Sequence, residues 1–218
     1  MTQNRVVTID IETRPADFCD LPVEGSKSRL TPEEAHLRTA LAGEWGQIIC
    51  IGYIDELDGQ VRSKGVLGFD EITGRLVDDE RALLFSFWEM MRGFEPSVDV
   101  LVGHNIAAFD LPFILKRSIV RGVRPTATIR APRYRTVPVA DTMLIWTSWT
   151  FGQMTSLSTL ARVFGLPDPK GNGVEGGSVY ELWQDGTRHR DIADYCMGDV
   201  ETTRAVYGRI VFENAHPN

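Results

Sequence analysis

The chain has 218 residues, of which 43% are hydrophobic and 24% are charged, a balance typical of a globular protein with a full core. Its formal net charge of −7 excludes binding of nucleic acid by bulk positive charge, so any such binding has to be local. The first residues contain no apolar signal segment, and no apolar run approaches the roughly 20 residues of a membrane span. We therefore expect a protein without a membrane partner, located in the cytoplasm.

The three cysteines, Cys19, Cys50 and Cys196, are an odd number, and no pair has the spacing of zinc ligands. Disulfide frameworks are typical of secreted chains with an even cysteine count. We expect a reduced intracellular protein whose cysteines are free thiols.

The apolar stretch 6–12 predicts a short buried strand, followed by a polar, proline-bearing segment to about residue 30. Thr31 is expected to begin a helix, because Pro32 stands at its first position and Glu34 completes a capping box. This helix is expected to be short and to end by Gly43.

A hairpin is expected next, because the turn signal Asp58-Gly59 separates two strands predicted at 47–54 and 61–67. A glycine-rich loop occupies 167–177. Apolar spacing predicts the remaining elements, which are a helix at 78–93, a strand at 98–104, a helix at 111–121, a strand at 137–141, and helices at 155–164, 178–184 and 190–214.

This order of elements predicts the fold class. Antiparallel strands come first and are followed by strands that alternate with helices, which is typical of an α/β protein. We expect a mixed five-stranded sheet flanked by helices on both faces. No repeat or linker divides the sequence, so a single domain over residues 1–218 is predicted. Ligands of such sheets bind at strand ends near the switch in strand order.

The first candidate site lies in the strand 6–12, which carries Asp10 and Glu12. Residues two apart in a strand point to the same face, so the two carboxylates project side by side. Burying both without a partner costs several kcal/mol, and Mg²⁺ or Mn²⁺ is a suitable partner because these ions prefer carboxylate oxygens. The alternative is a frayed strand end at which both side chains are solvated.

A second cluster, Asn105, Phe109 and Asp110, follows a predicted strand and precedes a helix. An amide and an aromatic ring beside an acid could hold a sugar-phosphate and stack a base. The alternative is that Asp110 is a simple helix N-cap.

A third cluster is on the last predicted helix, where Tyr195 and Asp199 are four residues apart and share a face with Cys196. That face also carries apolar residues, so it is expected to point inward. The alternative is a tyrosine–aspartate hydrogen bond at the margin of the core.

Together the three clusters resemble the DEDD family of 3′–5′ exonucleases in its tyrosine subgroup, and most closely the proofreading exonuclease domains of family B DNA polymerases, here as a stand-alone protein. The order Asp-x-Glu, Asn-x-x-x-Phe-Asp and Tyr-x-x-x-Asp matches, and the resemblance runs from Val6 to about Tyr207. The histidine subgroup would carry histidine at the position of Asp194. The segments Asp141-Thr142-Met143 and 156–161 resemble the family's region between its second and third motifs.

The resemblance implies a ribonuclease-H-like fold, two divalent ions, Mg²⁺ or Mn²⁺, and catalytic roles for five residues. Asp10, Glu12 and Asp199 would hold the metal that binds the attacking water. Asp10 would bridge to the second metal, near Asp110. Tyr195 would orient the water, since its ordinary pKa near 10 makes it a poor base at neutral pH.

The resemblance also implies substrate contacts near the 3′-terminal nucleotide. The backbone of Ile11 and the side chain of Thr13 would contact the terminal sugar. Phe109 would wedge near the last base unless it belongs to the core. From its amide alone, Asn105 is a candidate to hold a sugar-phosphate. Lys170, in the glycine-rich loop, is a candidate for a phosphate contact.

One further feature comes from the residues themselves. The stretch 111–140 contains seven basic residues and no acidic one. We predict that it is a track for the nucleic-acid backbone, with Arg117, Arg130, Arg133 and Arg135 as contacts. The alternative is a solvated helix face plus a loop. Trp146 and Trp149 could stack bases or belong to the core. The basic residues are Lys116, Arg117, Arg121, Arg124, Arg130, Arg133 and Arg135.

The sequence thus predicts a metal-dependent enzyme that hydrolyses phosphodiester bonds at the 3′ end of single-stranded nucleic acid, releasing nucleoside 5′-monophosphates. DNA is the favoured substrate and RNA stays open, because discrimination of the 2′-hydroxyl depends on fine geometry. The different-class alternative is a nucleic-acid-binding module of the same fold that is weak or inactive in catalysis. The sequence determines neither a polymerase or repair partner nor the oligomeric state.

Overall fold

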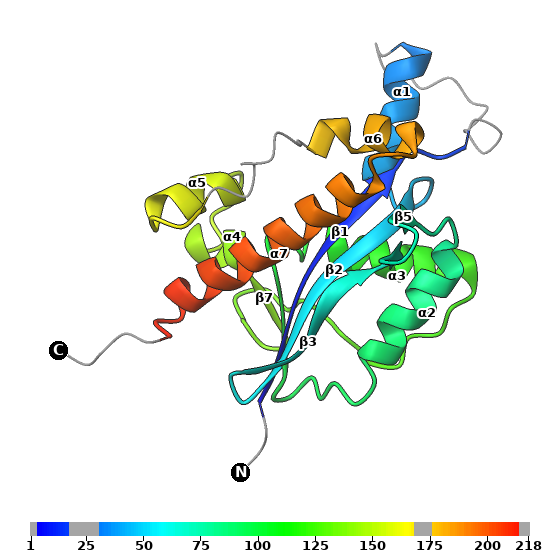
Figure 1. The fold of residues 1–218 in the computed structure, drawn as a ribbon. Helices are drawn as coiled ribbons and strands as arrows, with labels where there is room; N and C mark the ends of the chain where they lie inside the picture. The colour runs from blue at the N-terminus through cyan, green and yellow to red at the C-terminus, as the bar shows by residue number, and fades with distance from the viewer. Residues whose placement is uncertain (1–3, 18–30, 168–175, 214–218) are drawn as a thin grey trace.

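The computed structural model describes residues 4–17, 31–167 and 176–213, and its centre is one mixed five-stranded sheet (Figure 1). The strand order is β3-β2-β1-β6-β7. The first three strands pair antiparallel, whereas β1–β6 and β6–β7 pair parallel. The strands are β1 (Arg5–Arg14), β2 (Gln47–Leu57), β3 (Gln60–Leu67), β6 (Val100–Gly103) and β7 (Val139–Asp141).

Helices cover both faces of this sheet (Figure 1). On one face, α2 (Glu80–Met90) and α3 (Asp110–Arg121) pack on the largest hydrophobic cluster. On the other face, α7 (His189–Ile210) crosses β1 and β2, with three short helices around it. The fold class predicted from the sequence is therefore confirmed. The short helices are α4 (Thr142–Trp146), α5 (Leu157–Val163) and α6 (Val179–Asp185).

The predicted capping box is present. The hydroxyl of Thr31 accepts a hydrogen bond from the Glu34 N–H at 3.2 Å, and the Glu34 carboxylate accepts one from the Thr31 N–H at 2.7 Å. These bonds begin α1 (Pro32–Arg38), and a 3₁₀ turn, η2 (Thr39–Leu41), follows it.

Several short elements were not predicted. The ribbon β4 (Phe69–Asp70) with β5 (Arg75–Leu76), the turn η4 (Gly176–Ser178) and the five-residue helix α4 are too short for a hydrophobic period. The strands predicted at 98–104 and 137–141 are shorter than expected, as β6 and β7. In the described part of the chain, no helix is long and apolar enough to cross a membrane.

Successive side chains of β1 point to opposite faces of the sheet, and this alternation positions the site. Val7, Ile9 and Ile11 point toward α2 and α3 and are almost completely buried there. Asp10 and Glu12 consequently point to the opposite face, toward α7. In the strand order the chain continues from β1 to β2 on one side and later to β6 on the other side, so the carboxyl ends of β1 and β6 lie at the switch in strand order, where ligands of such sheets bind.

Candidate active site

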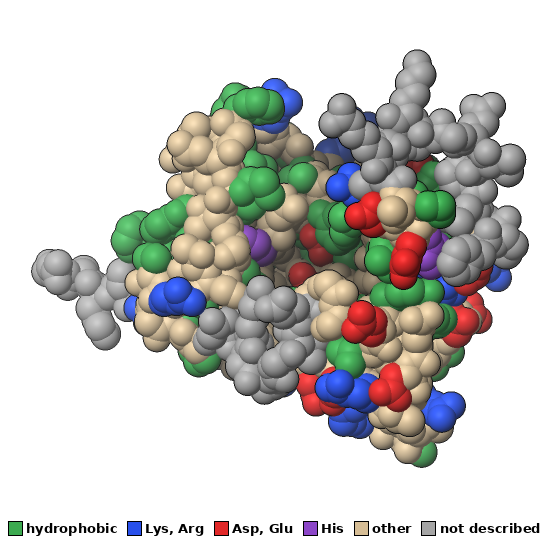
Figure 2. Space-filling view, turned by 90° about the horizontal axis from the view of Figure 1, so that it is seen from above, with side chains coloured by type: hydrophobic (Ala, Val, Ile, Leu, Met, Phe, Trp, Pro, Cys, Tyr) green, Lys and Arg blue, Asp and Glu red, His purple; other side chains and the backbone are tan. Residues whose placement is uncertain are grey.

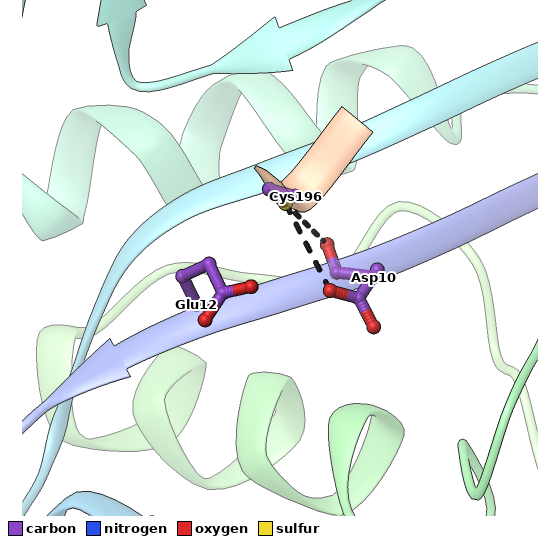
Figure 3. Close-up of side chains that lie close together, drawn as sticks. All are labelled: Asp10, Glu12 and Cys196. Atoms are coloured by element: carbon purple, nitrogen blue, oxygen red, sulfur yellow. Dashed lines mark hydrogen bonds between the residues drawn. The ribbon is translucent and has the colours of Figure 1, made fainter. Parts of the chain in front are cut away.

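The carboxyl half of β1 places two carboxylates side by side. Glu12 is 7% exposed and Asp10 is half-buried. Each side chain, together with Cys196 of α7, offers one ligand atom, and these three atoms lie within 4.8 Å of one another (Figure 3). Seen from above, the molecule has a hollow in which acidic side chains lie deep, with hydrophobic side chains around them (Figure 2). The predicted pairing of Asp10 and Glu12 on one face is therefore present.

The third acid, Asp110, is the first residue of α3 and is 3% exposed. It is not the N-cap, which is Phe109, and no side chain caps this helix. Instead, Asp110 Oδ1 accepts a hydrogen bond from the N–H of Ile11 at 3.2 Å. This bond ties the start of α3 to β1 between the two carboxylates of that strand.

Helix α7 brings Tyr195, Cys196 and Asp199 against the same part of the sheet. The thiol of Cys196 lies 3.6 Å from the carbonyl oxygen of Asp10 and 3.9 Å from its Oδ2 (Figure 3). The helix approaches closely because Gly52, the neighbour of Asp10 on β2, has no side chain. A Cβ at that position would lie 2.9 Å from Val200 Cγ2 and 3.0 Å from Cys196 Sγ.

The electrostatics of the cluster follow from burial and from like charges. Burial, and then the charges of Asp110 and Asp199, raise the pKa of Asp10 well above its ordinary value. Burial and then the charge of Asp10 do the same for Glu12. Burial raises the pKa of Asp110 to about 7. Burial and then the charge of Asp199 also raise the pKa of Tyr195, so this phenol keeps its proton at neutral pH.

These observations fit a divalent cation. The pKa values of Asp10 and Glu12 are raised by burial and by neighbouring acidic groups. A cation would compensate these charges, and carboxylate oxygens are the ligands that Mg²⁺ and Mn²⁺ prefer. Asp10, Glu12, Asp110 and Asp199 are the residues that could hold it.

Cys196 is the site residue that sequence reasoning missed, although its place beside Tyr195 on the inward face was visible. It is fully buried, and its Sγ accepts a hydrogen bond from the N–H of Gly52 at 3.2 Å. Its pKa is raised, chiefly by a hydrogen bond with Cys50. Both thiols are free, as predicted, whereas Cys19 lies outside the described residues.

The expected contacts to the terminal nucleotide have intramolecular partners. The N–H of Ile11 donates to Asp110, and the hydroxyl of Thr13 donates to the Ala40 carbonyl at 2.8 Å. Phe109 packs partly against the core, with its ring centroid 5.6 Å from that of Phe113. These substrate contacts stay predictions.

Asn105 has a left-handed backbone, with φ 63°, and its carbonyl accepts hydrogen bonds from the N–H groups of Ala108 and Phe109. Its N–H donates to the carboxylate of Asp141. Asn105 therefore shapes the turn that presents Asp110.

The basic stretch does not form one surface. Arg117 was expected to contact substrate, but it is 3% exposed and its guanidinium pairs with Glu80 at 2.8 Å, beneath α2. Arg117 is excluded from the track because burial and pairing remove its charge from the surface. Lys116 and Arg121 also form ion pairs, with Glu44 and Glu80.

The remaining basic residues of that stretch, Arg124, Arg130, Arg133 and Arg135, are exposed. Lys170 lies outside the described residues.

Comparisons with known proteins identify the family of the chain. Residues 45–216 match the family described as "Predicted 3'-5' exonuclease related to the exonuclease domain of PolB", and the chain belongs to this family. It is similar to the DNA polymerase delta catalytic subunits of Oryza sativa subsp. japonica, 28% identical over 123 residues, and of Glycine max, 26% identical over 125 residues. These matches cover 56% and 57% of this chain but only 10% of each relative.

Among solved structures, the fold is similar to that of the family B DNA polymerase from the archaeon Pyrobaculum calidifontis. The TM-score is 0.62 at 20% identity, and the match covers 95% of this chain and 24% of the polymerase. At this identity the match shows the fold alone, and it confirms the ribonuclease-H-like assignment. The protein is thus an exonuclease-like domain related to the proofreading domain of PolB.

Proposed function

We propose that the protein is a metal-dependent 3′–5′ exonuclease acting on single-stranded nucleic acid, with DNA favoured over RNA. The observation that carries the proposal is the convergence of Asp10, Glu12, Asp110 and Asp199, where the charges of the last two raise the pKa values of the first two, with Tyr195 beside them. A binding module gains nothing from burying mutually repelling carboxylates, since each costs free energy of folding. Their retention therefore favours catalysis over binding alone.

The reaction is hydrolysis of the terminal phosphodiester. Water attacks phosphorus, the bond from phosphorus to the 3′-oxygen of the penultimate nucleotide breaks, and a nucleoside 5′-monophosphate leaves. Divalent ions held by the four acids would supply activation of the water and stabilisation of both the attacking and the leaving oxygen. Mg²⁺ and Mn²⁺ both suit this oxygen-rich site.

The chain's own residues hold and orient the reactants. Tyr195 keeps its proton at neutral pH, because burial, the charge of Asp199 and a hydrogen bond to that carboxylate raise its pKa. Its hydroxyl therefore orients the water by hydrogen bonding and does not act as a base. Asp110 couples the strand to the helix through Ile11 and keeps the acids in register.

The test uses 5′-labelled single-stranded DNA and RNA of one sequence, with Mg²⁺ or Mn²⁺. We expect a ladder that shortens from the 3′ end, abolished by Asp199→Asn and unchanged by Asp194→Asn, an exposed acid on the same helix. The faster substrate identifies the preferred sugar. Absence of a ladder with every metal, while binding persists, would instead favour the nucleic-acid-binding module.

A further inference from the structure

A cavity of about 490 Å³ lies next to the acid cluster and has no role in the chemistry described above. Its lining includes Ala108, Arg133, Arg135, Tyr134, Trp149 and Phe151. These residues come from the turn before α3, from the segment 131–135, and from the segment that follows α4. The volume is within the range of sites for small organic ligands, so a nucleotide fits.

The cavity is joined to the active site through a turn and a buried acid. Ala107 and Ala108, which line it, directly precede Phe109 and Asp110. Asp141, also in the lining, accepts hydrogen bonds from the N–H groups of Asn105 and Ala107 at 3.1 and 3.0 Å. A polymer bound at the acids therefore passes close to the cavity.

The rim of the cavity exposes aromatic rings that the fold does not bury. Phe151 is fully exposed and Tyr134 is 70% exposed. The rings of Tyr134 and Trp149 lie 6.0 Å apart, centroid to centroid, at 54°. Both residues have a left-handed backbone, with φ 62° and 54°, a conformation that is uncommon for large side chains. Exposed large aromatic side chains gathered in this way are typical of an interaction site.

The charge of this region suits a phosphodiester strand. Between residues 111 and 167 the sequence has a single acidic residue, Asp141, in a chain of net charge −7. Asp141 is 4% exposed, and its carboxylate accepts four backbone N–H bonds, so it is directed into the fold. Arg133 and Arg135 are exposed and line the cavity together with the aromatic rings.

We propose that this cavity binds one unstacked nucleobase of the strand that is being hydrolysed, upstream of its 3′-terminal nucleotide. Tyr134, Trp149 and Phe151 would contact the base, and Arg133 and Arg135 the adjoining phosphates, since aromatic faces with a basic groove are the means by which proteins hold single strands. A paired base cannot leave its stack without cost, so the cavity selects single-stranded substrate. The proposal rests on the proposed function, because it takes the exonuclease substrate as the ligand.

The test measures binding in Asp10→Asn protein, which removes turnover. A set of labelled ten-nucleotide single strands carries one abasic position each, moved stepwise from the 3′ end. We expect one position at which loss of the base weakens binding roughly tenfold, a value in the range of base–aromatic stacking. Adding Tyr134→Ala and Phe151→Ala should cause a similar loss on the intact strand and remove the effect of that abasic position.

Both substituted side chains are exposed, so the fold should be retained, which a thermal melt verifies. The matched control is Trp146→Ala, an exposed tryptophan that packs on Phe164 and does not line the cavity. It should leave binding unchanged. Equal binding of all abasic strands, or an abasic effect that persists in the double variant, would overturn the proposal.

The two proposals fail differently. With Asp10 intact, Tyr134→Ala with Phe151→Ala should slow hydrolysis of the intact ten-nucleotide strand about tenfold at limiting substrate and leave unaffected the strand that is abasic at the position found by the binding scan. If the unsubstituted protein shows no metal-dependent hydrolysis, the exonuclease proposal is refuted. Unchanged hydrolysis of both substrates by the double variant would refute only the base-binding cavity.

Discussion

The carboxyl group of Asp110 makes the stability of the metal-free protein depend on pH. Its pKa is raised to about 7 by burial, against about 3.9 in an unfolded chain. The folded state therefore holds more protons than the unfolded state between these values, and the free energy of unfolding falls as pH rises through that window. Asp10 and Glu12 act in the same direction, because their pKa values are also raised.

We predict that Asp110→Asn flattens this dependence. In EDTA, the free energy of unfolding should fall between pH 4 and 8 by up to about 4 kcal/mol more in the unsubstituted protein than in the variant. This is the free energy that corresponds to a pKa shift of about three units. Urea unfolding across this range measures the difference. Parallel curves for the two proteins would show that Asp110 titrates normally.

Asp10 should couple metal binding to stability. In EDTA, Asp10→Asn should raise Tm by a few degrees, because it removes one of the mutually repelling charges. Millimolar Mg²⁺ or Mn²⁺ should raise the Tm of the unsubstituted protein and leave that of the variant unchanged. Thermal melts with and without metal make the measurement, and an equal gain in both proteins would place the ion elsewhere.

At the scale of elements, the close packing of α7 on the sheet depends on Gly52. We predict that Gly52→Ala lowers stability by about 1–3 kcal/mol, the cost of overpacking, because the new methyl group meets Val200 and Cys196. Displacement of α7 also moves Tyr195 and Asp199 relative to β1, so activity should fall by roughly tenfold or more. The matched control is Gly65→Ala on β3, where a Cβ meets only Tyr53 at 3.8 Å.

The packing of α3 on α2 depends on a buried ion pair. Arg117→Ala leaves the carboxylate of Glu80 short of a buried partner, and the expected cost is about 3 kcal/mol of unfolding free energy. Affinity for single-stranded DNA should not change at temperatures where the variant stays folded. Arg133→Ala should instead weaken the binding of single-stranded DNA and leave the free energy of unfolding unchanged. Weakened binding by folded Arg117→Ala protein would return Arg117 to the substrate track.

At the scale of the whole molecule, an acidic protein is expected to bind a polyanion through a local basic region. We predict that replacing Arg130, Arg133 and Arg135 by alanine lowers the slope of log affinity against log salt by about 2, at roughly 0.7 for each phosphate contact on single strands. Fluorescence anisotropy of a labelled single strand, measured between roughly 50 and 300 mM salt, gives the affinity at each salt concentration and hence the slope. Arg124→Ala, an exposed arginine in a different groove, should leave the slope unchanged.

The fold was predictable where the sequence carries a specific local signal, whether turn residues, a capping box or a long apolar period. The hairpin at Asp58-Gly59, the capping box at Thr31 and the apolar period of α2 all match the structure. The ribbon β4–β5 and helix α4 were missed, because elements of two to five residues carry no period.

The sequence by itself determined the chemistry available to this protein, because spacing of two on a strand and four on a helix sets which side chains share a face. Only the tertiary structure decided which of those side chains meet. The thiol of Cys196 and the carboxylate of Asp10 are 186 positions apart, and strand order together with Gly52 brings them together. Arg117 and Arg133 carry the same charge, but the fold buries Arg117 and pairs it with Glu80. This partner is 37 positions away in the sequence, so local composition does not reveal it.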